Sequence, residues 1–306
     1  MKKLWFLPLF LALACSSPNV NEENSRKSIV CTTGIIADVV DNLIGDSADV
    51  IALMGPGVDP HLYKASQGDV SKLSNADVII YNGLHLEGKM TDILGKMAQS
   101  RSVIKISDGV PEDKLLSSSD YPGTYDPHIW FDISIWNEAS DFVAEKLAQE
   151  FPEWKEMIEA NSAQWHEDLN KLDEWCTREI SSIPDSQRVL VTAHDAFKYF
   201  GHRYQIEVRG LQGISTAAEY GLRDISEMVT FITNQKINAI FIETSVPKRA
   251  VQAVVEGCAE RGHELKIGGE LFSDALGEED SSAGDYQGMV RHNVETIVGS
   301  LKGTAQ

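Results

Sequence analysis

The segment that most limits the fold lies in the middle of the 306-residue chain, at residues 152–183. It begins with Pro152, contains no glycine and no further proline, and places apolar residues at helical spacing from Trp165 to Ile183. One helix over this segment would be roughly 45 Å long at 1.5 Å per residue. The alternative is a pair of helices with a break near Asn161. A single helix of this length would join the flanking parts of the chain as a rigid spine and not as a hinge.

Both flanking parts alternate short strand patterns with helical patterns. The predicted strands are 28–33, 49–53, 77–81 and 102–106 in the first part and 188–193, 207–211, 238–243 and 264–269 in the second. The predicted helices are 34–45, 67–76, 88–99, 195–204, 222–235, 247–262 and 286–301. Such alternation is typical of α/β folds with parallel sheets. We therefore predict an N-terminal lobe at 29–151, a spine helix at 152–183 and a C-terminal lobe at 184–306.

The N-terminus has the features of an export signal. Two lysines precede an apolar run that is too short to span a membrane, so residues 1–14 are predicted to be a signal peptide. The run ends in Leu-Ala-Leu-Ala-Cys, which resembles a bacterial lipoprotein signal with Cys15 as the lipidated residue. Residues 15–28 are then a lipid-anchored tether. The alternative is ordinary secretion, in which Cys15 is removed.

Composition excludes several other classes of protein. Hydrophobic residues make up 42 % of the chain, which is too many for a disordered protein. The formal net charge is −19, and removing residues 1–14 with their two lysines lowers it to −21. A surface of this sign repels nucleic-acid phosphates and anionic lipid headgroups, so no nucleic-acid partner is expected. Cys31, Cys176 and Cys258 lie in apolar segments and are predicted to be buried free thiols.

Two loops repeat one motif, Asp-Pro-His followed by an aliphatic and an aromatic residue. It occurs as Asp-Pro-His-Leu-Tyr at 59–63 and as Asp-Pro-His-Ile-Trp at 126–130. Proline fixes its own φ and favours an extended conformation for the residue before it, so each histidine is held stiffly on its loop. The repeat therefore indicates that His61 and His128 point at a common target.

Further polar residues follow predicted strands of the second lobe. The strand at 188–193 leads directly into His194 and Asp195, and the strand at 264–269 is followed by the segment that carries Asp274. Parallel α/β lobes bind ligands at the carboxyl ends of their strands, so these side chains can face the gap between the lobes. Three imidazoles and one carboxylate complete a coordination shell for a transition metal. The candidate metal ligands are His61, His128, His194 and Asp274.

Other side chains have smaller predicted roles around this site. Asp195 or Glu243 is expected to hold an imidazole by accepting a hydrogen bond from the ring nitrogen that does not bind the metal. His85 follows a strand and is a weaker candidate for lining the cleft. The histidines predicted to be solvated or structural are His166, His202, His263 and His292.

Six segments together resemble a known family. They are VDPHLY, DPHIWFD, VTAHDAFKYF, GLQGIST, IFIETSVP and GGELFSDALG, and the resemblance covers residues 29–301. The chain is similar to the zinc- and manganese-binding class of ABC-importer substrate-binding lipoproteins, and within it to TroA-type receptors. The resemblance implies two (β/α)4 lobes joined by one long helix, with the metal site between them. By motif it assigns the same ligands, His61, His128, His194 and Asp274.

The resemblance also implies a function. The chain would be a monomeric receptor on the periplasmic or extracellular face of the cell envelope, anchored by lipid at Cys15. It would capture one Zn(II) or Mn(II) ion as its transported ligand and deliver it to an ABC permease and its ATPase. Zinc-dedicated relatives carry a histidine-rich loop before the second Asp-Pro-His, and residues 108–125 contain no histidine. Many manganese-type relatives carry Glu at the position of His194, so the chain lies between the two groups.

Two alternatives belong to other functional classes. A zinc-dependent hydrolase would use the three histidines, with Asp274 or Glu243 as its base. No enzyme is expected, because four protein ligands leave no open position for water and the chain contains neither HExxH nor Gly-x-Ser-x-Gly. A binding protein for a metal chelate or a vitamin would need a large apolar cleft and would give the four ligand candidates no shared role.

Overall fold

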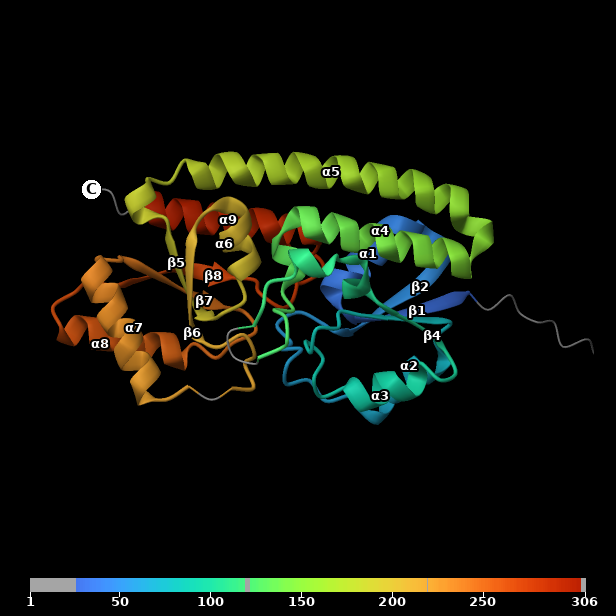
Figure 1. Ribbon diagram of the computed structural model, residues 1–306, viewed down its shortest axis with the longest axis horizontal. Coiled ribbons are helices and arrows are strands. Elements are labelled where there is room, and N and C mark those ends of the chain that lie inside the picture. The colour runs from blue at the N-terminus through green and yellow to red at the C-terminus, as the bar shows by residue number, and fades with distance from the viewer. Residues whose placement is uncertain (1–25, 119–121, 219, 304–306) are drawn as a thin grey trace, which may run out of the picture.

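A single long helix lies across two α/β lobes in the computed structural model, which describes residues 26–118, 122–218 and 220–303 (Figure 1). This helix, α5 (Lys155–Ser181), has 27 residues and a length of roughly 40 Å. A single 3₁₀ turn at Pro152–Trp154 precedes it. The helix runs unbroken through Asn161, whose Nδ2 donates a hydrogen bond to the carbonyl of Leu43 at 3.0 Å. The prediction of one long helix is confirmed, and the alternative with a break at Asn161 is wrong.

The N-terminal lobe is built on one parallel sheet with the strand order β2-β1-β3-β4. Its strands are β1 (Lys27–Thr33), β2 (Ala48–Met54), β3 (Val78–Tyr81) and β4 (Ser102–Lys105). Its helices are α1 (Gly34–Ile44), α2 (Gln67–Asn75), α3 (Thr91–Met97) and α4 (Ile133–Glu150). The chain passes directly from β1 into α1 because the Thr33 hydroxyl caps the helix by accepting the Ile36 N–H. Figure 1 shows α1 and α4 between the sheet and α5, with α2 and α3 on the opposite face.

The C-terminal lobe repeats the same plan with a looser sheet. Its strands are β5 (Val189–His194), β6 (Glu207–Gln212), β7 (Ala239–Glu243) and β8 (Lys266–Leu271). Its helices are α6 (Lys198–Tyr204), α7 (Leu222–Gln235), α8 (Arg249–Glu260) and α9 (Tyr286–Gly303). Parallel ladders join β5 to β6 and β7 to β8, and β5 lies beside β7. The spatial order β6-β5-β7-β8 matches that of the first lobe, which is a structural repeat without a clear repeat in the sequence.

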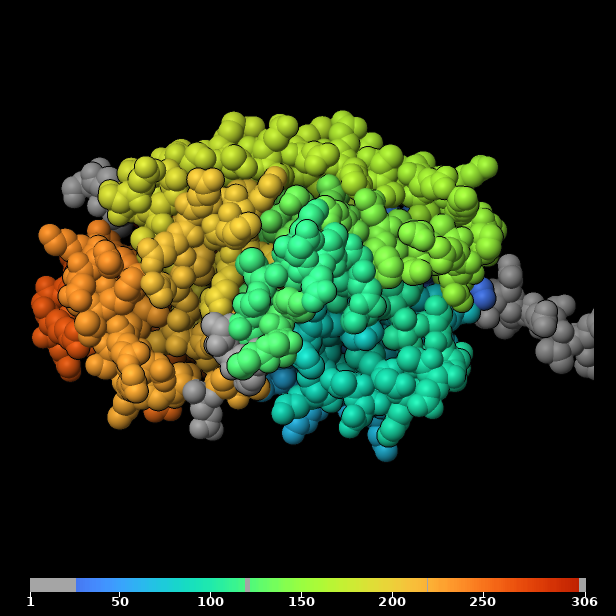
Figure 2. Space-filling model, viewed as in Figure 1, coloured from blue at the N-terminus to red at the C-terminus, as the bar shows by residue number. Residues whose placement is uncertain are grey.

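The two lobes and the spine helix share one hydrophobic core. One buried cluster includes Trp136 of α4, Leu172 of α5, Met289 of α9, and Phe197, which directly precedes α6. The rings of Phe131 and Phe197, one from each lobe, have centroids 4.3 Å apart. On the face shown in Figure 2, the lobes are in contact along their junction below α5. This continuous packing holds the lobes in a fixed relation, which a site made from both lobes requires.

The structure tests the prediction for the three cysteines, but it does not test the predictions for the N-terminal segment. Cys31, Cys176 and Cys258 are buried free thiols, as predicted. Among the described residues, no helix is long and apolar enough to cross a membrane. The predicted signal peptide at 1–14 and the predicted lipid anchor at Cys15 lie outside the described residues.

Candidate metal centre

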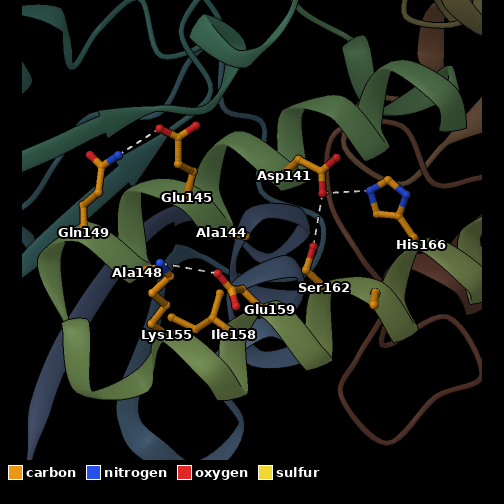
Figure 3. A pocket seen from close by; sticks show the side chains of 11 residues that line it. Asp141, Ala144, Glu145, Ala148, Gln149, Lys155, Ile158, Glu159, Ser162 and His166 are labelled. Carbon is orange, nitrogen blue, oxygen red and sulfur yellow. Dashed lines mark hydrogen bonds and ion pairs between the residues drawn. The ribbon is translucent and has the colours of Figure 1, made fainter.

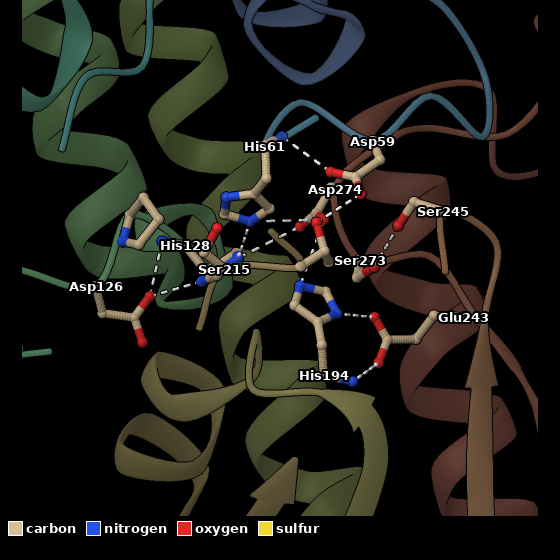
Figure 4. Close-up of polar contacts among 12 residues, drawn as sticks. Asp59, His61, Asp126, His128, His194, Ser215, Glu243, Ser245, Ser273 and Asp274 are labelled. Atoms are coloured by element: carbon tan, nitrogen blue, oxygen red, sulfur yellow. Dashed lines mark hydrogen bonds and ion pairs between the residues drawn. The ribbon is translucent and has the colours of Figure 1, made fainter. Parts of the chain in front are cut away.

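Four side chains meet at the junction of the lobes, each at or beyond the carboxyl end of a strand (Figure 4). His61 follows β2, and His128 lies on the connection from β4 to α4. His194 is the last residue of β5, and Asp274 follows β8. The structure therefore brings together, two from each lobe, the four residues that the sequence singles out.

The spacing of their side-chain atoms suits a single small ion. One ligand atom from each residue lies within 4.8 Å of all the others. His61 Nε2 is 3.3 Å from His128 Nε2, and Asp274 Oδ1 is 3.4 Å from His128 Nε2. Asp274 Oδ2 is 3.4 Å from His194 Nε2 and 4.0 Å from His61 Nε2. Two ligands bound at about 2.1 Å to one tetrahedral ion are roughly 3.4 Å apart, so these separations match the edges of a zinc-sized coordination tetrahedron.

Three of the polar atoms that face the centre of the cluster lack hydrogen-bond partners in the described part of the chain. The four residues are at most 3 % exposed. His194 Nε2 and both carboxylate oxygens of Asp274 are buried and make no hydrogen bond with the described residues. A buried polar atom without a partner is costly, and native structures contain few of them. A bound cation would satisfy all three atoms at once, so the donor set fits a metal ion.

The first Asp-Pro-His loop is fixed by its aspartate. Asp59 Oδ1 accepts the backbone N–H of His61 at 2.9 Å, which closes the turn around Pro60. Asp59 Oδ2 accepts the hydroxyl of Thr216, from the other lobe, at 2.6 Å. The carboxylate therefore orients the His61 loop and also ties it across the junction.

The second Asp-Pro-His loop uses its aspartate to hold the imidazole itself. Asp126 Oδ1 accepts the backbone N–H of His128 at 3.0 Å and lies 2.7 Å from His128 Nδ1. A carboxylate requires a proton on Nδ1, which leaves the lone pair of the neutral ring on Nε2, facing the cluster. The loop then enters α4 directly because Asp132 caps that helix through the N–H groups of Ser134 and Ile135.

His194 is held in the same way from the end of a neighbouring strand. Glu243, the last residue of β7, has Oε2 at 2.5 Å from His194 Nδ1 and accepts the His194 backbone N–H through Oε1 at 2.8 Å. Of the two predicted supporting residues, Glu243 therefore contacts an imidazole of the cluster. Asp195 instead pairs with Lys198 one turn along the chain, at 2.7 Å.

Burial and the surrounding carboxylates set the charge of the metal-free cluster. Burial lowers the pKa of His61 to about 3, helped by the nearby imidazoles, so His61 is neutral at pH 7. Burial also disfavours the charged form of His128, but Asp126 and Asp274 outweigh it and raise its pKa to about 9. Against the same burial, Glu243 and Asp274 raise the pKa of His194 well above its ordinary value. His194 and His128 in turn hold the pKa of Asp274 well below its ordinary value, although burial alone would raise it.

Comparison with known proteins identifies the family. Residues 29–300 match the family described as "zinc-uptake complex component A periplasmic" (ZnuA). The chain belongs to the ZnuA family. The match includes both lobes and the spine helix, so the whole cluster lies within the part of the chain that the family shares.

Proteins similar to this ZnuA-family chain carry different metals in their names. The manganese-binding lipoprotein MntA of Bacillus subtilis is 45 % identical over 294 residues, which is 96 % of each chain. The zinc-binding protein TroA of Treponema pallidum is 46 % identical over 278 residues, 91 % of this chain and 90 % of that protein. The solved structure of the periplasmic zinc-binding protein TroA from Treponema pallidum aligns with a TM-score of 0.88 and 45 % identity, over 90 % of this chain and 99 % of that chain. These matches confirm the two-lobed fold that the sequence motifs predict.

One functional candidate was not found from the sequence of this ZnuA-family chain. Asp126 was seen only as part of a motif that stiffens the loop, and its contact with the His128 ring was not predicted. The available signal was the motif itself, since an aspartate two residues before a ligand can reach both its backbone and its ring. Asp195, which directly follows His194 in the sequence, points to Lys198 because the strand end turns there into α6.

Another hollow in the described part of the protein lies between α4 and α5 (Figure 3). It has a volume of about 760 Å³. Its polar side chains satisfy one another: Asp141 accepts hydrogen bonds from Ser162 and pairs with His166, and Lys155 pairs with Glu159. Because these groups are already paired on an open surface, this hollow lacks the unsatisfied buried ligands of the cluster between the lobes.

Proposed function

We propose that the chain is an extracytoplasmic substrate-binding protein that captures one Zn(II) or Mn(II) ion for an ABC importer. The ligands are His61, His128, His194 and Asp274. The observation that carries this proposal is the set of four buried ligand residues that converge from both lobes, with the polar atoms of His194 and Asp274 left without hydrogen-bond partners among the described residues. Family membership and the similarity to proteins named for manganese and for zinc support it.

The site supports binding and not catalysis. Four protein ligands close a tetrahedral shell, whereas catalytic zinc retains a position for water or substrate. Glu243, the other candidate base of a hydrolase, is occupied with the ring and backbone of His194. The ion is therefore the cargo of the protein, and no reaction is proposed.

The donor set is compatible with both metals. Three imidazoles and a carboxylate suit zinc in four-coordinate geometry. Carboxylate oxygens also suit manganese, and Asp274 can offer both of its oxygens to a larger shell. Affinity alone favours zinc over manganese at nitrogen-rich sites, so the availability of each metal in the envelope contributes to which is carried.

The location and partners follow from the same proposal. Residues 1–14 would direct export, and Cys15 would anchor the tether at 15–28 to a membrane. The lobes at 29–151 and 184–306, joined by the segment 152–183, would present the loaded site to an ABC permease with its ATPase. The protein would act as a monomer.

Elemental analysis tests this proposal. The protein would be purified from its native envelope without added metal or chelator, and bound metals would be quantified per chain. One equivalent of zinc and manganese combined is expected. The His61→Ala and His128→Ala variants, folded as judged by circular dichroism, should lose that metal. A metal-free native protein, or full metal content in both variants, would contradict the proposal.

A further inference from the structure

A pocket lined by residues of both lobes borders the metal cluster at His61. Its volume is about 310 Å³. The residues that line it include His61, Leu84, His85, Tyr125, Pro127 and Ser215. His128, His194 and Asp274 are at most 1 % exposed and do not line this pocket. His61 is the cluster residue that borders this pocket, and it is therefore the first member of the cluster that an ion in the pocket would meet.

The histidine at the rim of the pocket sits on a costly turn. Gly83, Leu84 and His85 have successive positive φ angles of 84°, 52° and 68°. Glycine adopts such angles freely, whereas non-glycine residues adopt them uncommonly. Two such residues in a row persist only when the surrounding structure fixes them.

A buried carboxylate fixes the turn. Glu87 is 3 % exposed, and its Oε1 accepts the N–H of Asn82 at 2.7 Å and the hydroxyl of Thr32 at 2.7 Å. Its Oε2 accepts the N–H of Gly83 at 3.1 Å. Asn82 Nδ2 in turn donates to the carbonyl of Pro127 at 3.0 Å. The His85 turn is thus locked to the end of β1 and to the second Asp-Pro-His loop.

The imidazole that this turn presents is available for a ligand. His85 is exposed, and in the described part of the chain its side chain makes no hydrogen bond or ion pair. It also lines a second hollow of about 410 Å³, so His85 borders both hollows. A neutral imidazole is a good ligand for zinc and an adequate one for manganese.

We propose that His85 is an access ligand, which binds an incoming divalent transition-metal ion transiently and passes it through the pocket to His61. One ring nitrogen of His85 would replace a water of the hydrated ion, and His61 would then replace His85. The ion keeps its charge throughout, and only ligands exchange. This role rests on the proposed function of the cluster. As a ligand of the path and not of the final site, His85 changes the rates of binding and release and leaves the equilibrium affinity unchanged.

Stopped-flow kinetics with the full chain and chelator-buffered Zn(II) tests this proposal. Trp130 provides a signal because its ring centroid is 5.3 Å from that of His128. The test variant is His85→Asn, because asparagine tolerates the left-handed conformation and lacks the imidazole. Its association rate should fall about tenfold, at the low end of the range seen among variants of one binding site. The dissociation rate in a chelator chase should fall by the same factor. His202→Ala, at an exposed histidine of α6, is the matched control and should change neither rate.

The outcomes separate this role from that of the cluster. Unchanged rates in His85→Asn, with normal zinc binding by the wild-type protein, would overturn the access role alone. A weaker equilibrium affinity with an unchanged association rate would also overturn it, by making His85 part of the final site. Wild-type protein that binds neither Zn(II) nor Mn(II) would overturn the proposed function, and the access role with it.

Discussion

One carboxylate oxygen of Asp126 holds both the backbone and the ring of His128. The distances are 3.0 Å to the backbone nitrogen and 2.7 Å to Nδ1. The second Asp-Pro-His motif thus does more than stiffen a loop, because Asp126, which begins it, also selects the tautomer of His128, which ends it. Glu243, at the end of β7, likewise holds both the backbone and the ring of His194, but it uses one carboxylate oxygen for each.

Asp126→Ala should therefore weaken metal binding without removing a ligand. Loss of a partner that orients a metal-binding imidazole commonly reduces affinity by about 10–100-fold. Asp126→Asn keeps an oxygen acceptor and removes the charge, so its affinity should lie between those of wild type and alanine. Competition titration against a zinc chelator would measure all three affinities. Asp141→Ala, at an exposed aspartate of α4, controls for the loss of surface charge, and equal affinities in the alanine variant and wild type would show that Asp126 does not position His128.

Zinc binding should release protons at neutral pH. In the metal-free protein the raised pKa values of His128, about 9, and of His194 keep both rings protonated at pH 7. Ligating imidazoles must be neutral, so each of these rings loses its proton to the solvent when the ion binds. Calorimetry in buffers of different ionisation enthalpy would count the protons. Binding without proton release at pH 7 would contradict this picture of the metal-free cluster.

The gain in thermal stability on adding zinc should depend on pH for the same reason. A ligand that binds only the folded form stabilises it by mass action, and protons compete with zinc for the rings. The metal-free protein loses the stabilising contribution of protonated His128 as the pH rises from about 6.5, its unfolded pKa, through about 9. The zinc-induced increase in melting temperature should therefore grow from pH 6 to pH 9 and fade in acid. An increase that did not change with pH would be inconsistent with imidazole ligation.

His194 should govern the choice between zinc and manganese. Replacing it with glutamate would give two nitrogens and two carboxylates, a set that suits manganese better. Glu243, at 2.5 Å from the His194 ring, would then face a second buried carboxylate. The useful variant is therefore His194→Glu combined with Glu243→Gln, with Glu243→Gln alone as its control. Competition titrations with both metals should show a lower zinc-to-manganese affinity ratio in the double variant than in the control, and an unchanged ratio would assign selectivity to the shape of the site.

The lobes should close on the ion with little movement of the spine helix. They share one core, and Trp130 Nε1 donates across the junction to the carbonyl of Ser273 at 3.0 Å. Tyr286, of the second lobe, donates its hydroxyl to the Trp130 carbonyl at 2.7 Å. X-ray scattering with and without zinc should give the same radius of gyration within error. Trp130→Phe, which removes the donor to Ser273, provides a loosened reference, and a wide swing in the wild-type protein would refute the rigid junction.

Much of this arrangement was predictable from short-range patterns. Local sequence patterns indicate the alternation of strands and helices, the unbroken apolar stripe of α5, and the positions of His61, His194 and Asp274 at or after strand ends. The contact of Asp126 with the His128 ring could also have been predicted from the sequence, because the two residues are only two positions apart. The pairing of Asp59 with Thr216 and the anchoring of the 82–87 turn by Glu87 were not, because they depend on side chains brought together from distant parts of the chain.

The position of zinc in crystals of the protein tests the central claim most directly. Anomalous diffraction recorded at the zinc absorption edge locates the ion without reference to the protein geometry. The account predicts one strong peak per chain, about 2.0–2.2 Å from the Nε2 atoms of the three histidines and from an Asp274 oxygen. A strong peak at any other place in the molecule, with none between His61, His128, His194 and Asp274, would contradict it.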